Sequence, residues 1–168
     1  MGKGKTLLLG LVAVLVLPFG ISLAEDPPGQ DKKESYTWRN APRHSSGVAP
    51  SAQDHANQAI VMVMAADTFG WRGYFAVHPW IIFKRAGETS YTRYDVVGWG
   101  GGNVVRKNYA IPDGLWFGAK PKVLADHRGE AAEALIDEIE AAVASYPFPN
   151  EYRSYPGPNS NTFIAHIG

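Results

Sequence analysis

Short apolar runs separated by turns form most of this chain from residue 59 onward. The continuous apolar run AIVMVMAA at 59–66 predicts a strand that is buried on both faces. Residues 77–84 predict a second strand, and residues 90–97, where apolar and polar positions alternate, predict a third. Gly87 and Glu88 lie between these two runs and predict a turn that joins them into a hairpin. The pattern therefore favours a small antiparallel sheet.

Helical periodicity is confined to the C-terminal part of the chain. Residues 111–126 contain two prolines and two glycines and are predicted to form an ordered loop. An amphipathic helix is predicted over 129–146, because its large apolar residues recur at helical spacing: Leu135, Ile139, Val143 and Tyr146. Asn159 and Ser160 are both N-cap types and predict a short terminal helix over 161–167. The expected fold class is α+β, a small antiparallel sheet packed against one long helix and one short C-terminal helix.

The N-terminal part of the chain has a different pattern. Two lysines precede an apolar run at 7–17, and small residues before position 25 permit cleavage after Ala24. Two interpretations of 1–24 stay open, a cleaved secretory signal and an uncleaved anchor that contacts the membrane. Both predict an exported protein, either periplasmic or anchored in the inner membrane and facing the periplasm. Residues 25–56 are predicted to be a flexible linker, and 57–168 a single α+β domain.

The composition narrows the classes of function. The chain has 168 residues with 16 basic and 16 acidic side chains, so its formal net charge is zero. No basic patch stands out, and we therefore expect no nucleic-acid partner. The five histidines show no metal-ligand spacing, and no metal ion or other cofactor is predicted. The chain has no cysteine, which excludes disulfides and means that any nucleophile must be a hydroxyl group.

Three residues predict an acyl-transfer site. His78 opens an apolar strand, which would hold an imidazole base rigidly, and Ser160 lies where a helix begins. A helix N-terminus offers backbone N–H groups and a dipole that stabilise negative charge on a nucleophile or an oxyanion. Asp95 on the next strand is the best carboxylate to orient the histidine. Each residue also has a structural interpretation: Ser160 as a helix cap, His78 as a backbone-bonded strand residue, and Asp95 as a solvated strand residue.

Aromatic residues near this site predict ligand binding. Four tryptophans offer flat apolar faces for a glycan or an acyl chain: Trp71, Trp80, Trp99 and Trp116. Asn159 lies next to the predicted nucleophile. The alternative is that these tryptophans belong to the core.

The chain resembles the bacterial family called domain of unknown function 3750. Four motifs carry the resemblance, in the same order, from about residue 59 to the C-terminus: HPWIIFK at 78–84, YDVVGWG at 94–100, PDGLWFG at 112–118 and PGPNSNTF at 156–163. The resemblance implies an envelope protein with no settled activity. Members of the family continue past the point where this chain stops, so we expect a C-terminally truncated member.

The same site is similar, more distantly, to circularly permuted NlpC-like papain folds, which include lecithin retinol acyltransferase. In those proteins a strand histidine precedes an Asn-Cys pair that opens a helix, and His78 and Asn159-Ser160 match that order with serine in place of cysteine. A serine hydroxyl must be deprotonated during attack, whereas a thiol can ionise beforehand. The resemblance implies a papain-like permuted fold.

Two functions follow from these observations. One is a binding module, or degenerate enzyme, that uses a papain-like cleft for an envelope ligand such as peptidoglycan, a peptide or a lipid. The other is a serine-dependent hydrolase or acyltransferase that acts on an amide or ester in the envelope.

Overall fold

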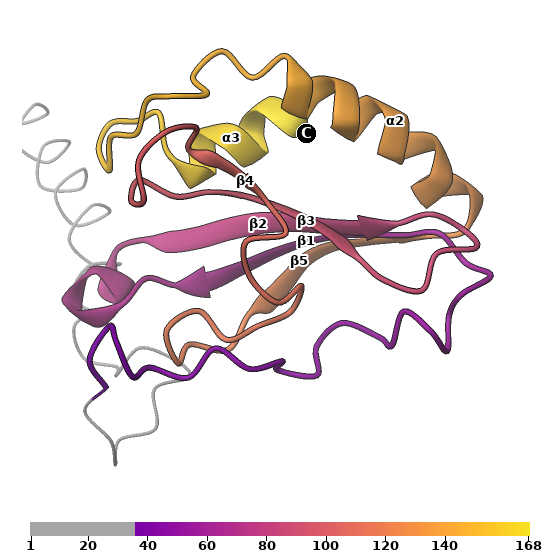
Figure 1. The fold of residues 1–168 in the computed structure, drawn as a ribbon, viewed down its shortest axis with the longest axis horizontal. Helices are drawn as coiled ribbons and strands as arrows, with labels where there is room; N and C mark the ends of the chain where they lie inside the picture. The colour runs from indigo at the N-terminus through magenta and orange to yellow at the C-terminus, as the bar shows by residue number, and fades with distance from the viewer. Residues whose placement is uncertain (1–35) are drawn as a thin grey trace, which may run out of the picture.

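The computed structural model describes residues 36–168, which form a five-stranded antiparallel sheet with two helices over one face (Figure 1). The strands are β1 (Ile60–Asp67), β2 (Val77–Lys84), β3 (Thr92–Val96), β4 (Val105–Lys107) and β5 (Lys122–Arg128). Their order is β4-β3-β2-β1-β5, and each neighbouring pair is antiparallel. The helices are the 3-10 helix η1 (Gly70–Tyr74) and the α-helices α2 (Glu130–Ala144) and α3 (Ser160–Ile167). The predicted α+β class is confirmed.

The sheet separates two layers of core, which explains the unbroken apolar run of β1. On one face Met62 and Met64 pack with Trp80 and with loop residues that include Trp116. On the other face Val61 packs against the apolar side of α2. Because successive side chains of a strand point to opposite faces, burial on both sides requires apolar residues throughout.

The C-terminal helix α3 covers the other end of the same face as α2 (Figure 1). Phe163 is fully buried and contacts the core that contains Val96 and Tyr146. The first residue of α3 is thereby held beside the beginning of β2, where the Asn161 Nδ2 donates a hydrogen bond of 3.4 Å to the Val77 carbonyl.

Residues 41–49, here called the strap, cross the face of the sheet that the helices leave open (Figure 1). The Asp113 carboxylate accepts hydrogen bonds from the Ser45 hydroxyl at 2.9 Å and from the Val48 amide at 3.0 Å. Ser45 also forms an antiparallel bridge with Gly114. The strap falls within the range assigned to a flexible linker, and here it is fixed to the domain. The sequence alone did not reveal this, because the strap has no apolar periodicity.

One strand was missed. The loop predicted over 111–126 is wrong for its last residues, which belong to β5 and pair with β1. This strand lies at the edge of the sheet and most of its residues are exposed, so it lacks the apolar run that marks the central strands.

Some predictions concern residues outside the described range. The signal or anchor at 1–24 and the beginning of the linker, up to residue 35, lie there. Among the helices of residues 36–168, none is long and apolar enough to span a membrane. The papain-like permutation is not confirmed and stays a prediction.

Candidate functional site

A cleft of about 1420 Å³ opens where the beginning of β2, the beginning of α3 and η1 meet the two loops that flank β4. Its lining includes His78, Ser160 and Asn161 together with Trp99 and Trp116. The sequence-predicted base and nucleophile, 82 positions apart in the chain (160 − 78), therefore face one cavity.

His78 is held by contacts on two sides. Its side chain is buried, with 4% of the residue exposed, and its ring stacks on Trp116 with centroids 3.6 Å apart and planes 7° from parallel. Its Nε2 lies 3.5 Å from Asp95 Oδ2, a long hydrogen bond. Both contacts fix the ring plane, and the strand fixes the backbone.

Asp95 is fully buried and contacts both the guanidinium of Arg93 and the imidazole of His78. Arg93 Nη2 donates to Asp95 Oδ2 at 2.7 Å, and Arg93 Nη1 donates to the Ile111 carbonyl at 2.7 Å. The guanidinium also lies over the Trp80 ring, 4.2 Å from its centroid. Burying an ion pair is costly unless its geometry is good. Arg93 Nε and Asp95 Oδ1 are nevertheless buried without a hydrogen-bond partner, so this pair is not optimised for stability alone.

The protonation states follow from these surroundings. Burial lowers the pKa of His78, and the neighbouring Asp95 opposes this without reversing it. Burial acts to raise the pKa of Asp95, but hydrogen bonds and charges from His78 and Arg93 outweigh it, so the pKa of Asp95 is lowered. At neutral pH the site then holds a carboxylate beside a neutral imidazole. Because a carboxylate only accepts hydrogen bonds, the His78 proton is assigned to Nε2, which leaves the Nδ1 lone pair free.

Ser160 is the first residue of α3 and is 3% exposed. Its hydroxyl makes no hydrogen bond to another described residue, including His78. Within residues 36–168, Ser160 Oγ is not one of the unpaired side-chain atoms that are fully enclosed, so part of its surface stays accessible. The hydroxyl therefore keeps contact with the cleft, although it is not hydrogen-bonded to the base.

The helix cap is Asn159, not Ser160. The Asn159 side chain accepts hydrogen bonds from the Asn161 and Thr162 amides, and the Thr162 hydroxyl accepts one from the Asn159 amide at 2.7 Å. This capping box uses two of the N–H groups expected to stabilise an oxyanion. In the first turn of α3, the backbone N–H of Ser160 has no hydrogen-bond partner among residues 36–168. The Asn161 side-chain amide also faces the cleft.

The predicted ligand-binding residues divide into two groups. Trp99 and Trp116 line the cleft, and Trp99 is 45% exposed. Trp80 is fully buried, does not line the cleft, and donates from Nε1 to the Pro112 carbonyl at 2.9 Å, so it belongs to the core. Its burial follows from the strand, since β2 is packed on both faces.

Several cleft residues carried no recognisable signal in the sequence. Arg93 was one of several polar residues on its strand, and nothing local shows that it would pair with Asp95 inside the protein. No sequence signal indicates that Arg43, Arg72 and Asn161 line the cleft, although all three do. Among residues 36–168, no three histidine or acidic side chains are grouped as a metal site.

Comparison with known protein families identifies a match. The model of a family described as "Protein of unknown function (DUF3750)" matches residues 58–168. No curated protein and no solved structure matches the chain.

Proposed function

We propose that this chain, a member of the DUF3750 family of proteins of unknown function, catalyses acyl transfer with Ser160 as the nucleophile. The proposal rests on the residues of its cleft. His78 is the general base, and Asp95 orients it. The observation that carries the proposal is the buried Asp95–His78 pair, which leaves the other ring nitrogen without a hydrogen bond to residues 36–168, in a residue that lines the same cleft as Ser160 with its unbonded hydroxyl.

The roles follow from the chemistry of each group. A neutral imidazole can accept a proton only through the nitrogen that carries none, here Nδ1. Asp95 holds the other nitrogen and stabilises the imidazolium that forms. The hydrogen bond from His78 and the charge of Arg93 together lower the pKa of Asp95 and keep it ionised.

The reaction proceeds in two steps. Ser160 Oγ attacks the carbonyl carbon of an amide or ester while its proton passes to His78 Nδ1. The negative charge on the carbonyl oxygen is stabilised by the Ser160 amide, with the Asn161 side chain as a second donor. Collapse expels the amine or alcohol, which takes the proton from His78. Water, or an acceptor hydroxyl or amine, then attacks the carbonyl carbon of the acyl-serine while its proton passes to His78. Collapse breaks the bond to Ser160 Oγ, which takes the proton back from His78, and the acyl product leaves.

The missing hydrogen bond between Ser160 and His78 must form when substrate binds. Catalytic hydrogen bonds are often long in ligand-free enzymes and tighten in the complex. The proposal requires the Ser160 hydroxyl and His78 Nδ1, which belong to residues that line the same cleft, to come within hydrogen-bond distance in the complex.

The compartment and substrate class belong to the same proposal. The lysine-flanked apolar run near the N-terminus supports export, and an exported acyl transferase would meet amides and esters of the cell envelope. The aromatic lining supports a substrate with an apolar group beside the scissile bond.

A fluorophosphonate probe tests the proposal, because it reacts with serines that a base activates. We expect the full chain to be labelled and Ser160→Ala to lose the label. Ser154→Ala is the matched control, since Ser154 also lines the cleft and should be dispensable. Equal labelling of Ser160→Ala and the unaltered chain would reject the nucleophile.

A second candidate is ligand binding without catalysis, which the absence of a Ser160–His78 hydrogen bond favours. In that case Trp99, nearly half exposed at the cleft, supplies the binding face. Tryptophan fluorescence titrations with soluble muropeptides and with dihexanoyl phosphatidylglycerol distinguish the two. Binding that Trp99→Ala weakens and Ser160→Ala leaves intact, in a chain that the probe does not label, would support this second candidate.

A further inference from the structure

Exposed aromatic side chains gather around the mouth of the cleft. Trp38, Trp99 and Tyr109 line it and are 60%, 45% and 52% exposed. Trp71 is 66% exposed and lies on η1, between the cleft-lining residues Phe69 and Arg72. We call Trp38, Trp71, Trp99 and Tyr109 the rim. Such large apolar surfaces are costly to leave in water and usually mark a binding surface.

Arginines are interleaved with the rim. Arg39 lies over the Trp38 ring at 5.0 Å, and Arg72 lies over the Trp71 ring at 5.2 Å. Neither forms an ion pair with a carboxylate of residues 36–168. The residues that line the cleft include no aspartate or glutamate and three arginines; buried Asp95 balances the charge of Arg93, whereas Arg43 and Arg72 pair with no carboxylate of residues 36–168. The mouth is therefore apolar and positively charged together.

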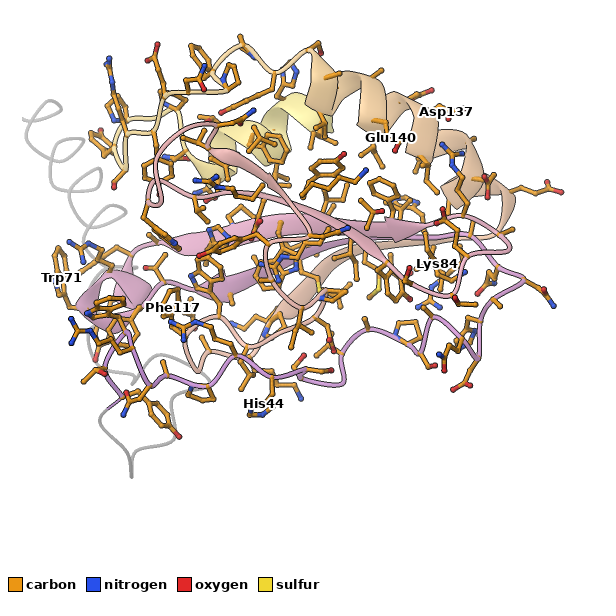
Figure 2. All side chains as sticks on the ribbon, viewed as in Figure 1. His44, Trp71, Lys84, Phe117, Asp137 and Glu140 are labelled. Atoms are coloured by element: carbon orange, nitrogen blue, oxygen red, sulfur yellow. The ribbon has the colours of Figure 1, made fainter. Side chains whose placement is uncertain are left out.

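The balancing negative charge lies elsewhere. Helix α2 carries five acidic residues and no basic one, so it stays acidic although Arg85 forms ion pairs with three of them. Figure 2 shows Asp137 and Glu140 on this helix, toward the opposite end of the molecule from Trp71 and Phe117. A chain with zero formal net charge thus has a basic aromatic end and an acidic end. An anionic surface would attract the rim and repel α2.

We infer that the rim docks on the surface of a lipid bilayer that carries anionic lipids, so that the cleft opens toward the membrane. Tryptophan and tyrosine prefer the interface between water and lipid, and arginine beside them adds attraction to anionic headgroups. This docking goes beyond the proposed acyl transfer and does not require Ser160 to react.

The position of the rim in the chain fits this occupant. Trp38 lies 14 positions after Ala24, where the apolar N-terminal segment ends (38 − 24). Fourteen residues span at most about 50 Å when fully extended. If the segment stays in the bilayer, Trp38 connects the rim to its tether by this short stretch of chain.

The absence of cysteine permits a site-specific test on the full chain. Ala76 is exposed beside η1 and lines the cleft, and Ala141 is exposed on α2. Ala76→Cys and its matched control Ala141→Cys would each carry one polarity-sensitive NBD label. Each protein is reconstituted in vesicles of phosphatidylcholine with phosphatidylglycerol, or of phosphatidylcholine alone, and quenched with doxyl-labelled lipid.

We expect a blue-shifted label at position 76 that lipid quenches in the anionic vesicles, and a water-like label at position 141. Each arginine near an anionic surface strengthens binding about fivefold. The double variant Arg39→Gln with Arg72→Gln should therefore lower the ratio of docked to undocked protein by about 25-fold. A label at position 76 that stays water-like would overturn the inference. So would quenching that is equal in both vesicles and indifferent to the arginines. Fluorophosphonate labelling reports on Ser160 separately, so failure of one proposal does not imply failure of the other.

Discussion

The imidazole of His78 stacks face to face on the indole of Trp116, with centroids 3.6 Å apart and planes 7° from parallel. This contact, together with Asp95 at one edge of the ring, leaves the imidazole little freedom to rotate. A base that cannot rotate keeps the direction of its free nitrogen fixed. Trp116 was expected to contact ligand, and the structure also gives it the position of a support for the base.

Replacing this support should impair the base before it unfolds the protein. Trp116→Leu removes the stacked ring and lets water reach His78, at a cost of about 3 kcal/mol in stability. We expect slower fluorophosphonate labelling and a His78 pKa, measured by NMR, that rises toward its ordinary value. Trp116→Phe keeps a stacked ring and should restore most of the rate. An unchanged His78 pKa in Trp116→Leu would contradict the assigned role.

The activity should have an acidic limb set by His78. Since burial lowers the pKa of His78 below 6.5, the base form persists to more acidic pH than in a free histidine. Labelling of Ser160 should therefore fall with a midpoint below pH 6.5. A midpoint above that value would show that another group controls the reaction.

The same shift predicts a dependence of stability on pH. Between pH 6.5 and the lower native pKa, unfolded chains bind a proton at His78 that native chains do not, so lowering the pH destabilises the fold. Above pH 6.5 this contribution is constant. Urea unfolding of the unaltered chain and His78→Gln across this range isolates it, because the variant should lose that part of the slope.

The Arg93–Asp95 pair should separate stability from function. Asp95→Asn leaves the buried guanidinium without its counter-charge and should cost about 3–5 kcal/mol in unfolding free energy. Adding Arg93→Met removes the stranded charge and should recover much of that loss. Labelling of Ser160 should stay impaired in the double variant, since His78 has lost its orienting carboxylate. Restored labelling would show that the pair is purely structural.

The sequence predicted the central strands and α2 well because burial imposes a regular pattern on them. In β1 every position is packed, so the apolar run is unbroken, and α2 buries one stripe of residues at helical spacing. Edge strand β5 and the strap escape this rule. They are held by backbone pairing and by hydrogen bonds to Asp113, which leave no periodic trace in the sequence.

The site was predictable only in part. His78, Asp95 and Ser160 could be chosen by residue type and by their place at element ends, and the structure gathers His78 and Ser160 at one cleft. The role of Asn159 as the cap depends on which residue begins the helix, and a shift of one residue decides it. Arg93 and Asp95 are two positions apart on one strand, and their pairing depends on the conformations of the two side chains inside the core.

The strap should act on the site through Asp113. This carboxylate, 5% exposed, accepts hydrogen bonds from Ser45 and from the Val48 and Ala49 amides, and it lies three residues before Trp116. Asp113→Ala should cost about 2 kcal/mol, because hydrogen bonds to a buried charge are lost. Amide hydrogen exchange at Val48 and Ala49 should accelerate, and Ser160 labelling should slow as the loop that carries Trp116 loosens.

A matched variant separates the charge of Asp113 from its geometry. Asp113→Asn keeps one acceptor oxygen and should retain slower exchange at Val48 than Asp113→Ala does. If the alanine variant leaves exchange at both amides unchanged, the strap is held by its apolar contacts instead. Exchange at Val48 that is slower in Asp113→Asn than in Asp113→Ala, together with normal Ser160 labelling in Asp113→Asn, would show that the strap needs only an acceptor at this position. The stack of Trp116 on His78 would then be preserved without the charge.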